Sequence, residues 1–384
     1  FGVILLFSLW IDVRWLKNRS KLLSKVYVSP VYVDLPTAAV TAADSGSPYA
    51  QNDKLREVEL IGLGEVEGPE DVILDENDNL YTGTRHGDII KFHGPDHKTF
   101  EVFAHIGGHP LGMAFDKDKN LISCIPGMGV YSVSPDQKIT KLTDQTNRSL
   151  TSVIDDDRLS LADDLDIAPD GRIFFSEASI RYGLEDWPVD CLESRGNGRI
   201  VVYDPKNKST KTIIKNLSFA NGVCLSNDGV SILYAETFGC RISQYWFDGP
   251  NKGNNRVIID NLPGYPDNIN RSSDGRYWLA LVGMRGPALD LALTMPGFRK
   301  RMARRVANSE WLYPNINTGC VIKFSEDGVV SDSLWDLGGV NHPMVTSMRE
   351  HKGYLYLGGI VSSWLVAIVQ EFKDHAHLRL INSL

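Results

Sequence analysis

The sequence lacks an excess of positive charge. Across 384 residues, 40 Lys and Arg residues are outnumbered by 48 Asp and Glu residues, so the formal net charge is −8. Nucleic-acid binding needs a basic surface that contacts many phosphates. We therefore expect no nucleic-acid partner.

Cysteine is scarce, and its spacing argues against a zinc framework. The cysteines form no Cys-x-x-Cys pair and show no zinc-like spacing with histidines. Because their number is odd, at least one thiol is free, and most are expected to be small core residues. A single disulfide is the alternative, which the sequence does not pair. The cysteines are Cys124, Cys191, Cys224, Cys240 and Cys320.

The apolar run at the N-terminus is short. Residues 1–10 read FGVILLFSLW, about ten apolar residues, whereas a membrane-spanning helix needs roughly 20. We expect residues 1–17 to be part of a membrane anchor, with a signal-peptide remnant as the alternative. The basic residues that follow favour a cytoplasmic flank. This conflicts with the extracytoplasmic or lumenal placement that we expect for the folded body, so the sidedness stays open.

Residues 18–54 are rich in Pro, Ser, Ala and Gly and show no sustained helical or strand period. This composition predicts a stalk or linker. The folded body is expected to cover residues 55–370, followed by a tail at residues 371–384.

One pattern recurs six times in the folded body. Each unit has a short apolar strand, a turn of Asp, Asn and Gly, and a strand rich in aromatic and β-branched residues, which together indicate a β-hairpin. Such repeats predict an all-β fold, a six-bladed β-propeller, with a β-sandwich as the alternative. We expect residues 54–63 to supply the strand that closes the ring. The six units are residues 69–84, 110–125, 163–178, 221–237, 266–282 and 345–360.

A segment between strands of the fifth blade interrupts this rhythm. Residues 284–306 read MRGPALDLALTMPGFRKRMARRV, which predicts helix. The segment is rich in Arg and Lys toward its end. A lid over the central channel, a membrane-facing basic surface and a solvated loop helix are all compatible with it.

Oxygen-bearing side chains stand at the start of several predicted inner strands. In a propeller these strands begin at the central channel, so their first residues converge on the axis. Buried acids and amides need compensation, and several oxygen ligands around one point are what Ca²⁺ requires. The lack of Cys and paired His ligands favours Ca²⁺ over zinc; the alternative is that these are turn and strand-cap residues. They are Glu70, Asp71, Asp163, Asp164, Asn221, Asp267 and Asn268.

Several strings resemble the strictosidine synthase-like family, among them EGPEDVILD, ADDLDIAPDGRIFFSEAS, FANGVCLS and LPGYPDNINRSSDGRYWLAL. The resemblance covers residues 55–370 and extends, through that family, to the calcium-dependent phosphotriesterase superfamily with its paraoxonases and gluconolactonases. It implies a propeller with one metal site. The implied ligands are Glu70, Asn221, Asp267 and the adjacent Asn268, with Asp163 where the family has Asn.

Two departures from this resemblance bear on the chemistry. Thr346 stands where strictosidine synthase has its catalytic Glu, and threonine cannot serve as the base of a Pictet–Spengler condensation. Leu111 stands where the paraoxonases have a His. We therefore do not expect strictosidine synthesis, and the case for a paraoxonase-style His base is weakened.

The remaining chemistry is that of a metal that polarises a carbonyl or phosphoryl oxygen, with a neighbouring carboxylate as base. Asp163 and Asp164 are the candidate bases. His109 and His342 are further candidates, because each precedes a proline near a blade head. Two functions stay open: a Ca²⁺-dependent hydrolase of small-molecule esters or lactones, and a non-catalytic propeller that binds a ligand or partner around a structural metal.

Five Asn-x-Ser sequons would suit a secreted eukaryotic domain. Asn270 lies two residues from the proposed ligand Asn268, too close to the channel for a glycan. The sequons are therefore a weak signal. They begin at Asn18, Asn147, Asn207, Asn216 and Asn270.

Overall fold

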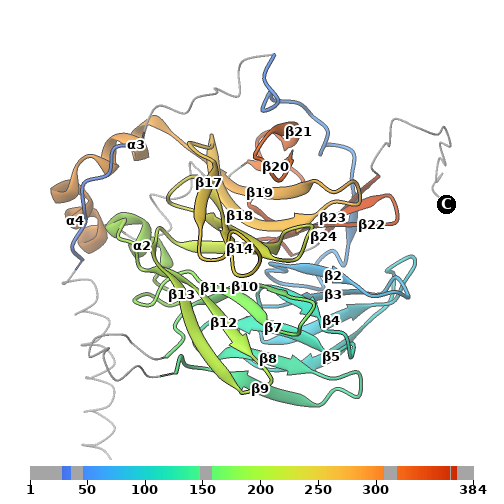
Figure 1. Cartoon of the computed structure of the whole chain (residues 1–384). Coiled ribbons are helices and arrows are strands. Elements are labelled where there is room, and N and C mark those ends of the chain that lie inside the picture. Colours follow the sequence, from blue (N-terminus) through green and yellow to red (C-terminus); the bar gives the residue numbers. More distant parts are fainter. Residues whose placement is uncertain (1–27, 36–45, 148–157, 307–317, 364, 370–384) are drawn as a thin grey trace, which may run out of the picture.

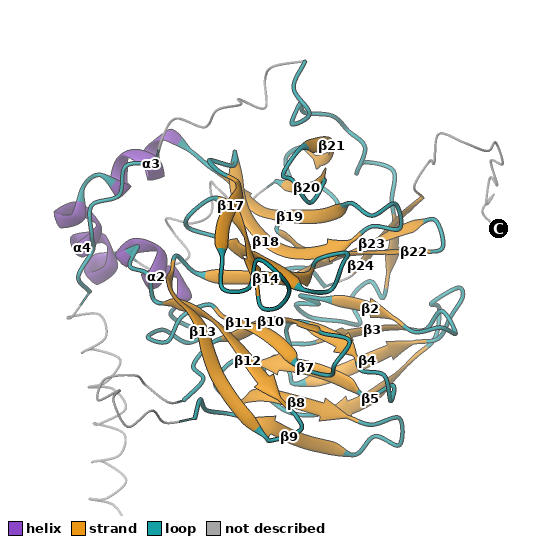
Figure 2. Ribbon diagram, in the orientation of Figure 1, coloured by secondary structure: helices purple, strands orange, loops and turns teal. Residues whose placement is uncertain are grey.

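Six four-stranded antiparallel sheets surround a central axis as the blades of a propeller (Figures 1 and 2). The prediction of an all-β, six-bladed β-propeller is confirmed. The predicted anchor at residues 1–17 and the tail at residues 371–384 lie outside the described residues. The computed structural model describes residues 28–35, 46–147, 158–306, 318–363 and 365–369.

Each blade runs outward from its innermost strand in chain order, except that the last blade borrows its outer strand from the N-terminal side. Blade 1 is β2 (Val72–Leu74), β3 (Leu80–Gly83), β4 (Asp88–Phe92) and β5 (Phe100–His105). Blade 2 is β6 (Met113–Phe115), β7 (Leu121–Ile125), β8 (Gly129–Val133) and β9 (Ile139–Thr143). Blade 3 is β10 (Ala162–Ile167), β11 (Ile173–Glu177), β12 (Gly198–Asp204) and β13 (Ser209–Leu217).

The second half of the ring follows the same plan. Blade 4 is β14 (Ala220–Leu225), β15 (Ser231–Glu236), β16 (Arg241–Trp246) and β17 (Asn255–Ile259). Blade 5 is β18 (Gly264–Arg271), β19 (Tyr277–Met284), β20 (Gly319–Phe324) and β21 (Val330–Asp336). Blade 6 is β22 (Val345–His351), β23 (Tyr354–Gly359), β24 (Leu365–Val369) and β1 (Glu59–Ile61).

The inner hairpins turn where the sequence places Asp, Asn and Gly. In blade 1, Asp75 Oδ1 accepts hydrogen bonds from the backbone N–H groups of Asn77 and Asn79, both at 2.9 Å. Asp78 has a φ of 66°, a left-handed conformation that Asp and Asn adopt more readily than other non-glycine residues. The turn residues therefore hold the register of this hairpin.

The core lies between neighbouring blades. Phe175 and Val201 of blade 3 are fully buried and belong to one cluster with Ile122 and Val130 of blade 2. Burying such a side chain stabilises the fold by about 1.5–3 kcal/mol relative to leaving it exposed. All five cysteines are buried free thiols, so the alternative of a disulfide is not realised.

The ring closes through a strand from the N-terminal side. β1 pairs antiparallel with β24, with Glu59 opposite Ala367 and Ile61 opposite Leu365. This is the pairing expected for residues 54–63. The last blade is thus built from both ends of the folded body.

Three short helices form a cap at one side of the propeller (Figure 1). Two of them occupy residues 284–306, where helix is predicted, whereas the helix between β11 and β12 does not follow from the repeat pattern. Arg299 is fully buried in the cap and donates to Leu192 O and Leu293 O at 2.6 and 2.8 Å. Among the described residues, no helix is both long and apolar enough to cross a membrane. The cap helices are α2 (Trp187–Glu193), α3 (Pro287–Leu293) and α4 (Pro296–Arg305).

Residues 28–35 form an N-terminal strap that packs against the cap, which differs from the free stalk that we expect from composition. The backbone N–H groups of Val31 and Val33 donate to Glu193 O and Leu293 O, at 3.1 and 3.2 Å. These acceptors are the last carbonyls of α2 and α3, which have no partner within their own helices. Local composition cannot reveal such bonds, because the acceptors lie far along the chain.

Candidate metal and substrate site

Four oxygen-bearing side chains from four blades line one central cavity. Glu70 lies just before β2, while Asp163, Asn221 and Asp267 lie in β10, β14 and β18. Their exposed fractions are only 3–6%, so their charges and dipoles are withdrawn from bulk water. The inner strands of a propeller all start at the channel, and the fold therefore brings these four predicted ligands together.

Three buried oxygens at this site have no hydrogen-bond partner among the described residues: Glu70 Oε2, Asn221 Oδ1 and Asn268 Oδ1. Asn268 is buried, and its Nδ2 donates to Glu70 Oε1 at 2.8 Å. A buried polar atom without a partner costs about 1–3 kcal/mol. A bound cation is one way to compensate buried oxygens of this kind.

Burial raises the pKa of the carboxyl groups at the site. The pKa of Glu70 lies well above its usual range because of burial and then because of the negative charge of Asp267. Burial and the neighbouring Asp163 likewise raise the pKa of Asp267 well above normal. Burial raises the pKa of Asp163 to about 7. These carboxyls therefore favour retaining protons, which a bound divalent cation would displace.

The set of donor atoms fits a hard divalent cation. Carboxylate and amide oxygens are the ligands that Ca²⁺ takes in proteins, at about 2.3–2.6 Å. In the part of the chain that the structure describes, no three Asp, Glu, His or Cys side chains form a metal-ligand group by themselves. A metal site in this cavity would therefore have to include amide oxygens such as those of Asn221 and Asn268, and such ligands favour Ca²⁺ over zinc.

Asp71 and Asp164 have a different role from Glu70 and Asp163, the acids directly before them in the sequence. Asp71 Oδ2 accepts from Met113 N, and Asp164 Oδ2 accepts from Val223 N, both at 2.8 Å. Each bond joins the inner strand of one blade to that of the next. Asp164, a candidate base by sequence, is not among the residues that line the cavity, and its carboxylate serves as a clamp between blades.

The two candidate histidines also lie outside the lining of the cavity. His109 Nε2 donates to Gly68 O at 2.8 Å, and burial lowers the pKa of its imidazole. His342 is buried with its Nδ1 3.3 Å from Ser362 Oγ, and burial lowers its pKa to about 4. The structure places both as neutral packing groups.

The walls of the cavity are largely apolar, and apart from Leu111 they were not identified from the sequence. Trp187 stacks on Phe238 at 6.4 Å, and Phe219 lies 4.7 Å from Phe238, each distance joining ring centroids. The cavity measures about 60 Å³; one water needs roughly 10–15 Å³, so several waters fit. These residues come from loops and from α2, where no periodic pattern marks them. The apolar walls include Leu111, Leu184, Trp187, Phe219, Met344 and Ile360.

Thr346 and Leu111, the two departures from the resemblance, both line the cavity. Thr346 Oγ1 donates to Glu70 O at 2.6 Å. Its hydroxyl is therefore committed to the backbone next to the site, and no carboxylate occupies this position.

Comparisons with known proteins agree with this architecture. Residues 163–250 match the family model described as strictosidine synthase, and residues 47–92 match the one described as strictosidine synthase-like, N-terminal. The adipocyte plasma membrane-associated protein of Salmo salar is 32% identical over 357 residues, which cover 88% of this chain and 83% of that relative.

Solved propellers share the fold at low identity. A gluconolactonase from Xanthomonas campestris superposes with a TM-score of 0.57 at 15% identity, over 89% of this chain and 96% of that one. A calcium-binding protein, regucalcin, from Agrobacterium tumefaciens superposes with a TM-score of 0.52 at 13% identity, over 83% of this chain and 95% of that one. At these identities the likeness concerns the fold alone. The curated relative and the family-model matches show that the chain belongs to the strictosidine synthase-like family.

Proposed function

We propose that the protein is a Ca²⁺-dependent hydrolase of small esters or lactones. The observation that carries the proposal is the group of partnerless buried oxygens, on Glu70, Asn221 and Asn268, beside a cavity with apolar walls. These residues and Asp267 would hold Ca²⁺, which supplies a Lewis acid for a carbonyl oxygen when bound. The fold shared with a gluconolactonase and a calcium-binding protein supports the proposal.

Side chains of the cavity would bind the substrate and accept the proton. Trp187 and Phe219 offer an apolar surface for the acyl or aryl part of an ester and exclude water from it. Asp163 lines the same cavity, and its carboxylate is the candidate base that would accept a proton from the attacking water. Thr346 offers no base, because threonine has no carboxylate.

A non-catalytic propeller with a structural metal is the second candidate. One observation favours it: no His, Lys or Cys side chain is found among the described residues that line the cavity. On this alternative, removing Ca²⁺ lowers the thermal stability, and no ester is hydrolysed.

A hydrolysis screen distinguishes the two candidates. The full chain is assayed with aryl esters and lactones in Ca²⁺, in chelator and after Ca²⁺ is restored. Glu70→Gln is compared with the control Glu57→Gln, whose side chain is exposed. If the protein is a hydrolase, chelator abolishes its activity. The Glu70→Gln variant is then inactive, and the Glu57→Gln variant is as active as the unchanged protein. Hydrolysis unchanged by chelator would refute the proposal, whereas Ca²⁺-dependent stability without hydrolysis would establish the second candidate.

We also propose that residues 1–17 anchor the protein to a membrane, with the propeller on the extracytoplasmic or lumenal side. A relative named for the plasma membrane supports the association. The sequon residues Asn147, Asn207 and Asn216 are exposed, whereas Asn270 is buried and closed to a glycan. Expression in eukaryotic cells should give a glycosidase-sensitive protein that loses this sensitivity when the exposed sequons are removed. Digestion of the propeller by protease added to the cytoplasmic side of sealed vesicles would contradict the placement.

A further inference from the structure

Exposed apolar side chains gather on the cap. Leu291, Met295 and Phe298 are 62%, 45% and 40% exposed, and Tyr32 of the N-terminal strap is 62% exposed. The strap hydrogen-bonds to the end of α3, so Tyr32 belongs to the same region. We call these four side chains the apolar ridge. Exposed apolar side chains that gather in this way mark an interaction surface more often than scattered ones do.

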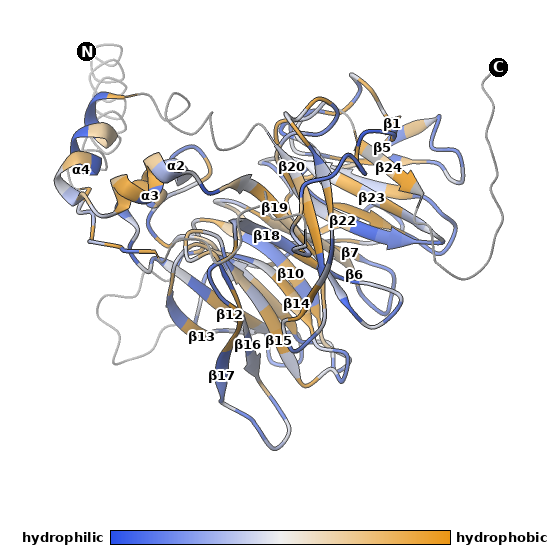
Figure 3. Ribbon diagram, turned by 90° about the horizontal axis from the view of Figure 1, so that it is seen from above, coloured by the Kyte–Doolittle hydropathy of each residue, from blue (hydrophilic) through white to orange (hydrophobic). Residues whose placement is uncertain are grey.

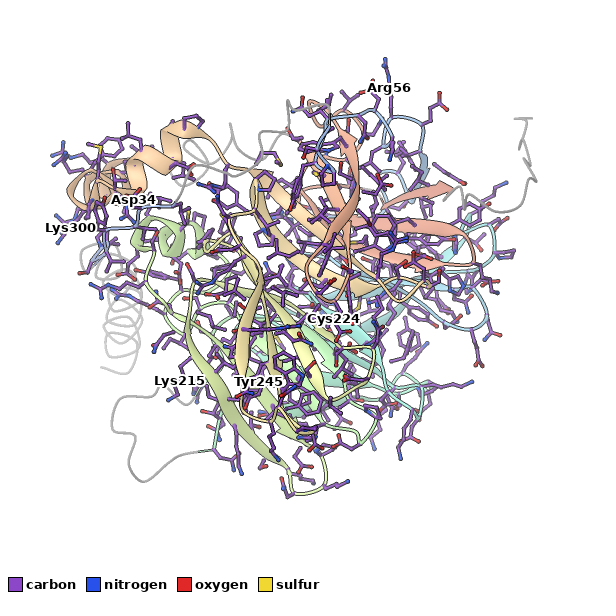
Figure 4. All side chains as sticks on the ribbon, turned by 45° about the horizontal axis from the view of Figure 1, so that its top comes forward. Asp34, Arg56, Lys215, Cys224, Tyr245 and Lys300 are labelled. Carbon is purple, nitrogen blue, oxygen red and sulfur yellow. The ribbon has the colours of Figure 1, made fainter. Side chains whose placement is uncertain are left out.

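Cations border the apolar ridge. The one acidic residue of α3 and α4, Asp290, pairs with Arg285 at 2.9 Å, and the exposed acid of the strap is Asp34. Figure 3 shows the apolar α3 beside the more charged α4, and Figure 4 places Lys300 at the outer edge of the cap. The exposed cations of α4 are Lys300, Arg301, Arg304 and Arg305.

The packing of α4 sets which side chains face outward. Arg299 and Ala303, one helical turn apart, are the buried residues of α4. Arg299 joins the carbonyl ends of α2 and α3 and also donates to Val31 O of the strap. With this face held against the body, the cations on the other face of α4 are directed to solvent. The cap thus presents a fixed apolar and basic surface.

We propose that this cap face docks on an anionic lipid surface, in the leaflet on the propeller's own side of the membrane. Apolar side chains beside Lys and Arg are the pattern of interfacial helices, which bury the apolar part about 5–10 Å into the headgroup region. Each Lys or Arg near an anionic leaflet strengthens binding about fivefold. An acidic protein would match the same charges and could also bury apolar side chains, so the choice of a lipid surface rests on the course of the chain.

The course of the chain also favours a lipid surface as the partner of the cap. The strap is preceded in the sequence by the apolar run of residues 1–10. Residues 11–27 join the two and can reach at most about 60 Å when fully extended. An anchor so close would raise the effective concentration of the cap at a bilayer, so two weak contacts would act together.

The docking face also adjoins one wall of the cavity. Helix α2, whose Trp187 lines the cavity, packs against α4.

A site-specific probe separates docking of the cap from binding through the N-terminal anchor. The native cysteines are all buried, so a single introduced surface cysteine can be labelled with an environment-sensitive fluorophore in the full chain. Phe298→Cys reports on the apolar ridge, and Leu291→Cys gives an independent position. The matched control is Val340→Cys, an apolar side chain that is 78% exposed and lies between blades 5 and 6.

Vesicles of phosphatidylcholine with phosphatidylserine should raise and blue-shift the emission at Phe298→Cys and Leu291→Cys but not at Val340→Cys. The combined change Lys300→Glu with Arg301→Glu should raise the lipid concentration for half-maximal signal by about tenfold or more. Lys206→Glu with Lys208→Glu, at exposed positions of blade 3, should leave it unchanged. Binding of vesicles without an emission change at either ridge position, or equal responses with phosphatidylcholine alone, would overturn the proposal.

Discussion

Asn268 Nδ2 donates a hydrogen bond of 2.8 Å to Glu70 Oε1, across 198 positions of the sequence. The bond links blade 5 to the residue just before blade 1. It leaves Asn268 Oδ1 and Glu70 Oε2 without hydrogen-bond partners among the described residues. The donor of this amide is therefore used within the protein, while its acceptor oxygen is available to a ligand.

Asn268→Leu should remove the stabilisation that Ca²⁺ confers. The change deletes one oxygen ligand and the donor that orients Glu70. In the unchanged protein, a ligand at 100 times its Kd stabilises the native state by about 2.7 kcal/mol. Thermal unfolding with and without Ca²⁺ measures the difference. Asn254→Leu, at an exposed position, should keep the full Ca²⁺ response; an equal response in Asn268→Leu would rule out its role as a ligand.

Asp163→Asn should separate binding of the metal from hydrolysis. Asparagine keeps a polar oxygen in the cavity but cannot accept a proton near neutral pH. We expect the Ca²⁺-dependent rise in Tm to persist, while kcat falls by about 10²–10⁴-fold, the range for loss of a general base. Steady-state kinetics and thermal unfolding on the same preparation test both parts. Retention of full kcat would assign the base to another group.

His342 should make the fold sensitive to acid. Its pKa is lowered to about 4 from an ordinary 6.5 by burial. Between these pH values the unfolded chain binds a proton that the folded chain does not, so stability falls as the pH decreases from 6.5 toward 4. Relative to His342→Gln, the unchanged protein should lose roughly 2–3 kcal/mol more between pH 7 and pH 4.5. Urea unfolding at the two pH values measures this loss.

Asn254→Gln is the control for that experiment, because Asn254 is exposed and its side chain does not titrate. Its pH dependence should match that of the unchanged protein. If His342→Gln behaved in the same way, the buried imidazole would not be a source of the acid sensitivity.

Trp187→Ala should weaken the use of aryl esters. The indole forms part of the cavity wall and stacks on Phe238. Removing an apolar contact from a binding site costs about tenfold or more in kcat/KM, and the loss should be smaller for compact lactones. Trp246→Ala, on β16 with its ring against Arg256, is the matched control. Equal losses in both variants would indicate a general effect on the fold.

The six hairpins could be predicted because Asp, Asn and Gly at the turns act locally. The residues at the axis could be predicted because a propeller repeats one geometry, so Glu70 and Asp267 take corresponding places at their blade heads. His109 and His342 lie close in sequence to blade heads, but chain proximity does not determine the direction of a side chain. Trp187 lies in an inserted helix whose position depends on contacts with α4, and no local pattern carries that information.

The strand pairing that closes the ring also constrains the order in which the protein can fold. β1 and β24 lie about 300 residues apart, and closing a loop of that length opposes folding through chain entropy. During synthesis, blade 6 must wait until its C-terminal strands leave the ribosome, and until then β1 has no partner for its exposed edge. Long-range pairing of this kind slows folding and exposes unpaired strand edges to aggregation. A truncation that removes either strand should therefore lower the yield of soluble protein far more than removal of a comparable surface loop.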